Sequence, residues 1–339
     1  MKLLIVSITA LLAPLLLTTP QWTMQSSGVT ARLRGVSAVN TQVAWASGSG
    51  STVLRTTNGG ASWQKLQVTA ETLDFRDIDA VDENTAYALS IGTGAASRIY
   101  KTTDAGKSWT LQFKNSDEKA FLDAMSFWDG KHGLVIGDSV EGQFYILRTV
   151  DGGKNWSRVP ASELPPALEN EGAFAASGSN IAVAGKNNAW IGLGAASKAR
   201  VLRTNDGGRT WKVADTPLDS GPSVGIFSIA FRDDKHGVIV GGDYRKETEA
   251  NHNLAFTSDG GITWKAGVGL SGFRSVVAYV PGAKESLIAV GPSGTDYSSD
   301  DGRSWSSIPG RGFDTLSFAK AAAVGWASGA GGGIGRLNF

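Results

Sequence analysis

Thr204–Trp211 reads Thr-Asn-Asp-Gly-Gly-Arg-Thr-Trp, and the chain carries six copies of this octet. The short Asp side chain can accept hydrogen bonds from backbone N–H groups just ahead of it, and the Gly adopts a positive φ without strain. The octet therefore predicts a tight turn between two strands, with the closing tryptophan buried at the start of the second strand. Five Asp and one Asn occupy equivalent turns, so we interpret them as structural residues and assign no catalytic residue among them.

The spacing of the octets indicates the fold. The closing tryptophans lie 41 to 55 residues apart, at Trp63, Trp109, Trp156, Trp211, Trp264 and Trp305. A period in the forties with strand-like units is typical of a β-propeller, in which each repeat forms one four-stranded blade. Seven innermost strands are predicted near Leu33–Val39, Phe75–Val81, Phe121–Phe127, Phe174–Val183, Ile226–Phe231, Phe273–Tyr279 and Phe313–Phe318.

The seventh repeat lacks its outermost strand. It runs from Phe313 to Phe339 and ends where a third strand is expected. Trp22 precedes Trp63 by 41 residues, which is within the range of the other spacings. We therefore predict that Gln21–Gln25 completes the last blade and removes an otherwise exposed sheet edge. The predicted fold class is all-β: one seven-bladed propeller over residues 21–339, closed by pairing of its N-terminal and C-terminal strands.

Composition excludes several functional classes. The chain has 339 residues, a formal net charge of +1, three His and no Cys. A nearly neutral chain argues against nucleic acid as the main partner, and the scarcity of His and Cys argues against a transition-metal site. We expect no disulfide, no metal, no cofactor and a monomeric protein.

The first twenty residues resemble a leader. Lys2 precedes Leu3–Leu17, an uncharged and mostly apolar run of 15 residues. Such a run is short for a membrane-spanning helix and suits the core of a secretory signal. We interpret residues 1–20 as a signal peptide or an uncleaved N-terminal anchor. The expected location is exported, either periplasmic or extracellular.

Candidate ligand-binding residues come from the longest loops and from the starts of inner strands. The insertions at Pro160–Gly172 and Asp243–Asn253 both project onto the propeller face opposite the octet turns, and long loops on a scaffold are where function is sought. Charged residues near the starts of inner strands, including Arg34, Asp123 and Asp314, are placed to face the central channel. The candidates are Asp138, Glu141, Glu171, Asp243, Arg76, Arg274 and His252.

These charges leave alternatives open. A channel mouth lined by carboxylates and guanidinium groups suits a sugar, a peptide or a polar protein loop. Two carboxylates at a suitable separation among Asp138, Glu141, Glu171 and Asp243 would perform glycoside hydrolysis. Solvated loop charges and ion pairs between blades are the third alternative, and the sequence does not give the separations that decide.

The octet matches the Asp-box, or BNR, repeat of sialidases, xyloglucanases and related propellers. The longer unit, in which Ala44–Gly48 leads to Val53–Trp63, resembles the photosystem II assembly and stability factor family. The resemblance extends from about Trp22 to Phe339, and it implies a seven-bladed, non-enzymatic propeller that helps to assemble the photosynthetic reaction centre at thylakoid membranes. Sialidases carry a Phe-Arg-Ile-Pro segment, whereas the segment beginning Phe75-Arg76 lacks the proline.

Two functions therefore follow from the sequence. The first is an exported, non-enzymatic propeller that binds a protein or peptide and takes part in photosynthesis as an assembly factor. The alternative is a glycan-binding protein or glycoside hydrolase of the Asp-box type.

Overall fold

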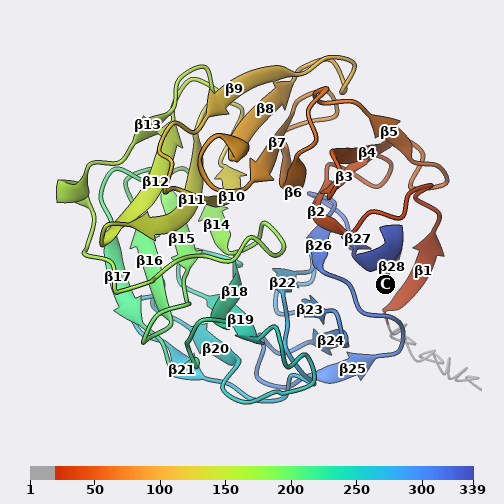
Figure 1. Ribbon diagram of the computed structural model, residues 1–339. Coiled ribbons are helices and arrows are strands. Elements are labelled where there is room, and N and C mark those ends of the chain that lie inside the picture. Colours follow the sequence, from red (N-terminus) through yellow and green to blue (C-terminus); the bar gives the residue numbers. More distant parts are fainter. Residues whose placement is uncertain (1–19) are drawn as a thin grey trace, which may run out of the picture.

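The computed structural model describes residues 20–339, which form seven four-stranded antiparallel sheets arranged as blades around a central axis (Figure 1). The leader expected at residues 1–20 lies, apart from its last residue, outside the described residues. The seven-bladed, all-β prediction is confirmed. None of the helices in the described part of the chain has the length and apolar character needed to span a lipid bilayer.

Each blade runs from an inner strand beside the channel to an outer strand at the rim. Blade 1 contains β2 (Leu33–Ala38), β3 (Ala44–Gly48), β4 (Thr52–Thr56) and β5 (Gln64–Leu66). Blade 2 contains β6 (Asp74–Ala80), β7 (Ala86–Ile91), β8 (Arg98–Thr102) and β9 (Thr110–Lys114). Blade 3 contains β10 (Leu122–Phe127), β11 (Gly133–Val140), β12 (Gln143–Thr149) and β13 (Ser157–Arg158).

The remaining blades follow the same order. Blade 4 contains β14 (Ile181–Ala184), β15 (Asn188–Gly192), β16 (Arg200–Thr204) and β17 (Lys212–Asp215). Blade 5 contains β18 (Val224–Phe231), β19 (Gly237–Asp243), β20 (Leu254–Thr257) and β21 (Lys265–Ala266). Blade 6 contains β22 (Val276–Tyr279), β23 (Leu287–Gly291), β24 (Gly294–Ser298) and β25 (Ser306–Ile308).

Blade 7 contains both chain ends. Its strands β26 (Thr315–Phe318), β27 (Val324–Ser328) and β28 (Ile334–Asn338) come from the C-terminus, and β1 (Gln21–Gln25) pairs with β28 as the outer strand. The pairing is antiparallel, with Trp22 opposite Leu337. Figure 1 shows the red N-terminal strand beside the blue C-terminal strand. The predicted closure is confirmed, residue for residue in β1.

The octet turns form as their sequence predicts. Asp206 Oδ1 accepts hydrogen bonds from the backbone N–H groups of Arg209 (2.9 Å) and Thr210 (3.0 Å). Gly207 and Gly208 have φ values of 74° and 81°, a region that an L-residue enters only with strain. Burial acts to raise the pKa of Asp206, but the hydrogen bonds from Thr210 and Thr204 outweigh burial and lower it to about 2. The Asp206 carboxylate therefore stabilises the turn through hydrogen bonds within the octet.

Side chains of the inner strands join several neighbouring blades. The Ala80 N–H donates to Ser37 Oγ at 3.0 Å, and the Ala38 N–H donates to Ser317 Oγ at 3.1 Å. Between blades 2 and 3 the acceptors are carboxylates: Asp77 Oδ2 accepts from Met125 N–H at 2.7 Å, and Asp79 Oδ2 accepts from Phe127 N–H at 2.9 Å. These contacts fix the inner strands, and therefore the channel wall, in one arrangement.

The inner strand of blade 4 shows the largest displacement from its predicted start. The strand expected near Phe174–Val183 forms only from Ile181, as β14. Gly178 in the preceding segment has a φ of 73°, and the Ser177 and Ser179 hydroxyls lie 2.7 Å apart, so the chain turns before it enters the sheet. The displaced segment places Phe174 at the channel mouth.

Candidate functional site

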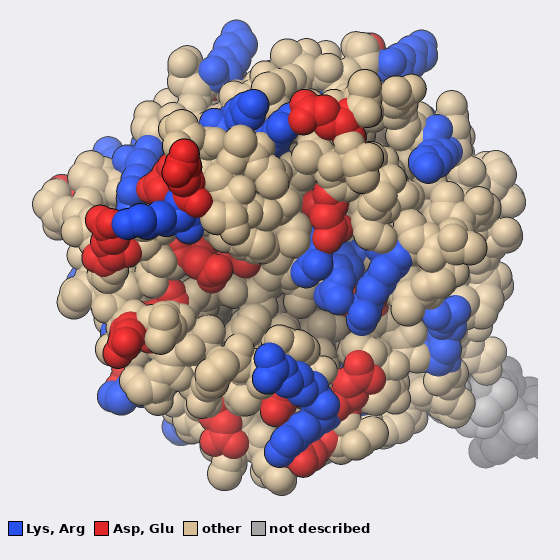
Figure 2. Space-filling model, viewed as in Figure 1, with Lys and Arg blue, Asp and Glu red and all other residues tan. Residues whose placement is uncertain are grey.

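A cavity of about 510 Å³ lies at the channel mouth, and residues from all seven blades line it. It opens on the face that carries the loops between blades. Figure 2 shows a hollow at the centre of this face, with basic groups crowded along one side and acidic groups elsewhere around it. Because every inner strand begins at this face, each blade contributes a few residues to the cavity lining.

β-Bulges aim the lining side chains. Each of four inner strands contains one register shift, which leaves a single residue unpaired. These four residues are Arg34, Arg76, Asp123 and Phe227. All four line the cavity. A bulge inserts one extra residue opposite a single partner and redirects its side chain. The equivalent positions in blades 6 and 7 are Ser275 and Asp314, which also line the cavity.

Three arginines occupy one side of the mouth. Arg32 forms a bidentate ion pair with Asp314, with Nε–Oδ2 and Nη2–Oδ1 distances of 2.8 and 2.7 Å. Arg76 Nε lies 3.0 Å from Asp74 Oδ2, and its Nη1 donates to the Ala175 carbonyl at 3.1 Å. Both guanidinium groups therefore already have carboxylate partners.

Arg34 differs from its two neighbours. Within residues 20–339 it forms no ion pair and no side-chain hydrogen bond. Burial, with the positive charges of Arg32 and Arg76, lowers the pKa of Arg34 to about 10 against the opposing effect of Asp314. Arg34 is still a cation at neutral pH, and it is a half-buried one without a partner. Such a group favours an incoming carboxylate.

Two carboxyl groups of blade 3 occupy another part of the lining. Asp123 is 2% exposed, and its Oδ2 atom is buried without a hydrogen-bond partner. Burial, together with the negative charge of Asp138, raises the pKa of Asp123 well above its usual value. Burial also raises the pKa of Asp138 to about 6. The described residues include no group of three or more His, Asp or Glu side chains that would hold a metal ion.

Aromatic rings supply the apolar part of the wall. Phe174 stacks on Phe227 with ring centroids 4.0 Å apart, and Phe273 meets Phe227 edge-on at 4.7 Å. Tyr244, from the insertion that follows β19, lies 6.1 Å from Phe227 and is 42% exposed. The mouth thus combines an apolar wall with separate cationic and acidic regions, which is the composition expected of a ligand pocket.

Of the seven candidates chosen from sequence, Arg76 and Asp138 line this cavity. Arg274 does not: it is fully buried, and it pairs with Asp296 at 2.7 Å. The register explains the difference, because Ser275 and not Arg274 occupies the position equivalent to Arg34. A shift of one residue turns a strand side chain to the opposite face.

Glu171 is also buried within the protein. Its carboxylate pairs with Arg200, whose Nε lies 2.7 Å from Oε1, and it accepts a hydrogen bond from the Leu168 N–H at 2.8 Å. Glu171 has no exposed surface. The sequence predicted Glu171 as a ligand contact, but its carboxylate instead stabilises the loop that contains it.

The last three candidates lie outside the cavity lining. Glu141 is exposed and pairs with Lys119 at 2.7 Å. The Nδ1 atom of His252 lies 3.2 Å from Asp219. Asp243 accepts a hydrogen bond from the Arg245 N–H at 3.0 Å. The loop that contains Asp243 and His252 nevertheless contributes to the site, because Tyr244 and Glu247 from this insertion line the mouth.

Sequence reasoning missed Arg32, Glu247 and the aromatic wall. The sequence does contain one signal for cavity-lining residues. The inner strands of several repeats start with Phe or Leu followed by a polar residue, as in Leu33-Arg34 and Phe75-Arg76. No comparable pattern marks Phe174, because the loop that carries it departs from the repeat.

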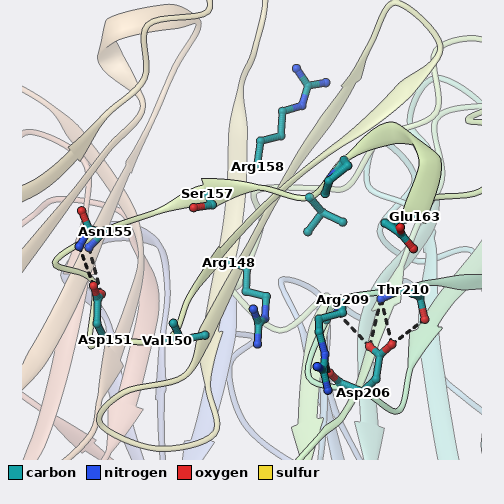
Figure 3. Close-up of a pocket in the computed structure, with 13 residues that line it drawn as sticks. Arg148, Val150, Asp151, Asn155, Ser157, Arg158, Glu163, Asp206, Arg209 and Thr210 are labelled. Carbon is teal, nitrogen blue, oxygen red and sulfur yellow. Dashed lines mark hydrogen bonds between the residues drawn. The ribbon is translucent and has the colours of Figure 1, made fainter.

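A second cavity, of about 560 Å³, lies between blades 3 and 4 (Figure 3). Several of its polar groups are engaged in local structure. Arg148 Nε donates to the Gly207 carbonyl at 2.6 Å, and Asp206 is bound by Arg209 and Thr210 of its own turn. Figure 3 shows Arg158 pointing away from Arg148. This cavity offers no unpaired charge comparable to Arg34.

Comparison with known proteins supports the resemblance seen in the repeats. Residues 18–118 match the model of the family described as Photosynthesis system II assembly factor YCF48. Among solved structures, "YCF48 bound to D1 peptide" is similar over 94% of this chain and 97% of that chain, with 18% identity and a TM-score of 0.66. YCF48 from Cyanidioschyzon merolae is similar over 94% of this chain and 98% of that chain, with 16% identity and a TM-score of 0.65.

The same fold occurs in an enzyme. The GH74 xyloglucanase from Xanthomonas campestris is similar over 94% of this chain, at 15% identity and a TM-score of 0.64, but this chain spans only 53% of that protein. A comparison with curated protein sequences gave no match. The resemblance to photosystem II assembly-factor propellers is confirmed by the match over the first blades, and the solved structures confirm the fold.

Proposed function

We propose that this chain, whose first blades carry the repeat of the photosystem II assembly-factor propellers, is an exported and non-enzymatic protein that binds a peptide segment of its partner at the channel mouth. The observation that carries the proposal is the half-buried, unpaired Arg34 inside a cavity of about 510 Å³. The partner is a membrane-associated protein under assembly, and the propeller binds it as a monomer.

The chemistry of the mouth favours a peptide that bears a carboxylate. A guanidinium group can bind a carboxylate through two parallel hydrogen bonds, and it is less strongly hydrated than an ammonium group. Folding has already removed part of the hydration of Arg34. Binding of a carboxylate therefore requires less additional desolvation of this guanidinium group. A peptide C-terminus or an Asp or Glu side chain supplies that group.

The aromatic wall supplies the remaining contacts. Phe174 is partly exposed and rests on the buried ring of Phe227, so a side chain of the ligand packs against a rigid surface. Rigid aromatic rings provide contact area at low entropic cost. The similar structure of YCF48 is one that holds a D1 peptide, which supports peptide binding as the activity of this mouth.

Export and lack of catalysis complete the proposal. The apolar run Leu3–Leu17 supports export, with residues 1–20 acting as a signal peptide or as an anchor. Turn aspartates such as Asp206 are engaged by their own backbone, which supports a non-enzymatic role. Cell fractionation of the full chain tests export: recovery in the cytosol alone would contradict it.

Peptide binding is tested with a soluble positional-scanning library of octapeptides that have free C-termini. We expect wild-type protein to select a defined subset and Arg34→Gln to lose about tenfold or more in affinity, as for loss of a charge-assisted bidentate contact. Arg303→Gln is the matched control, because Arg303 is an exposed arginine beside the turn that begins at Asp300. Absence of selection by wild type, or equal effects of the two substitutions, would reject the proposal.

A further inference from the structure

We infer that Asp123 and Asp138 form a separate subsite in the channel mouth, which takes a cationic side chain (Lys or Arg) of the bound peptide. This inference rests on the proposed function and names a second feature of the ligand. Both residues line the same cavity as Arg34. They belong to adjacent strands of one blade, with Asp123 at the bulge of β10 and Asp138 in β11.

The first argument is an unsatisfied buried atom. Asp123 is 2% exposed, and its Oδ2 atom has no hydrogen-bond partner among the described residues. A buried carboxyl oxygen without a donor costs free energy, and folded proteins keep few such atoms. Because Asp123 lines the cavity, a cation bound there would lie beside this carboxyl group.

The second argument is the concentration of negative charge. Asp138 forms no ion pair within residues 20–339, and it lies close enough to Asp123 to raise the pKa of that carboxyl. The nearby guanidinium of Arg76 is paired with Asp74. Two neighbouring carboxyl groups therefore lack a dedicated cation, and a ligand ammonium or guanidinium would serve both.

The third argument is the surrounding wall. The chain segment that follows Gly172 passes against Asp138, since a Cβ atom placed on Gly172 would lie 2.0 Å from Asp138 Oδ1. Two residues later, Phe174 contributes its ring to the same cavity. The acidic pair therefore lies beside the segment that leads into the apolar wall of the mouth. A metal ion fits less well, because two carboxylates are fewer than the ligands that a metal site needs.

The two subsites make the mouth dipolar. Blade 1 presents the unpaired Arg34, and blade 3 presents Asp123 and Asp138. A peptide whose acidic and basic groups are spaced like the two subsites can place its acidic group at Arg34 and its basic group at Asp123 and Asp138. The reversed peptide orientation would place like charges together. Complementary charges of this kind mainly set specificity and register.

The test uses pairs of octapeptides taken from those selected by the wild-type protein, which differ only in Lys or Arg against norleucine at each position. We expect one position at which the basic peptide binds about tenfold more tightly than its norleucine match, the size of effect seen for close interfacial charge pairs. Asp138→Asn and Asp123→Asn should each reduce this ratio toward one, because they weaken the basic peptide more than its norleucine match. Arg34→Gln should weaken both peptides and preserve the ratio.

Proton release gives a readout that a purely structural role would not change. Burial and the charge of Asp138 raise the pKa of Asp123, whereas a bound cation favours the ionised form, so binding of a cation should release protons. Calorimetry of the basic peptide at pH 6 in two buffers of different ionisation enthalpy should show proton release with wild type and less release with Asp123→Asn. Peptides that bind with no basic preference at any position would overturn this inference alone, whereas failure of every peptide to bind would overturn the proposed function.

Discussion

The indole of Trp22 packs against the ring of Phe313, with ring centroids 4.6 Å apart. One residue lies at the start of the described chain and the other near its end. Their contact covers the β1–β28 pairing in blade 7 and joins a cluster that includes Leu337 and Val276 of blades 7 and 6. The two chain ends are therefore held by side-chain packing as well as by backbone hydrogen bonds.

Trp22→Ala should destabilise the closure. Truncation of a buried Trp typically costs about 3 to 5 kcal/mol, and because Trp22 is only partly buried we expect about 2 to 3 kcal/mol of lost unfolding free energy. Met24→Ala is the matched control, since Met24 lies on the same strand and is 48% exposed. Urea denaturation of both variants measures the difference. Equal midpoints for Trp22→Ala and wild type would show that the contact does not hold the ring closed.

The octet carboxylates should act on stability and not on binding. Asp206→Ala removes acceptors for the Arg209 and Thr210 N–H groups, so we expect a loss of about 1 to 2 kcal/mol. Asp206→Asn should cost much less, because Asn58 occupies the same place in blade 1 and accepts the equivalent bond from Ser62 N–H at 3.0 Å. Thermal denaturation ranks the variants. A loss of peptide affinity in folded Asp206→Ala protein would contradict a purely structural role.

The fold could be predicted because its determinants are local and repeated. An octet such as Thr204–Trp211 fixes its own turn through hydrogen bonds within a few residues. The six copies give the spacing of the blades, and the seven predicted inner strands give their number. Even the closing strand could be found, because Trp22 keeps the period of the other tryptophans. The segment around Phe174 was placed with the largest error, since its loop departs from the repeat.

The site was less predictable because strand register and tertiary pairing decide it. Arg76 and Arg274 both follow a Phe near the start of an inner strand, yet a bulge directs Arg76 into the channel while Arg274 pairs with Asp296. The contact between Glu171 and Arg200 likewise depends on how a long loop folds back. A sequence shows that such charges exist, but not which of them already have partners.

Glu171→Gln should therefore destabilise the protein rather than impair binding. Removal of one charge from a buried ion pair leaves the other without compensation, which typically costs about 3 to 5 kcal/mol. Arg200 would be that uncompensated charge. Glu169→Gln is the control, because Glu169 is an exposed residue of the same loop. Urea denaturation should separate the two variants, and similar stability for both would contradict the assigned role of the pair.

Stability should fall as pH rises from about 4 to 8. Burial raises the pKa of Asp77 to about 8, even though hydrogen bonding from Met125 N–H opposes the rise, and burial likewise raises the pKa of Asp79 to about 6. In the unfolded chain these groups titrate near pH ~4. Between the two values the folded protein binds protons that the unfolded chain does not, so raising the pH favours unfolding.

Asp77→Asn tests this pH dependence. The amide oxygen can still accept from Met125 N–H, but it no longer carries a titrating proton. We expect the melting temperature of wild type to fall between pH 5 and 8 on the order of several degrees, and that of Asp77→Asn to fall less. At pH 8 the variant should therefore be the more stable protein. Asp82→Asn, the same change at an exposed turn residue of the same blade, should follow the wild-type curve. Parallel curves for Asp77→Asn and wild type would show that Asp77 does not control this pH dependence.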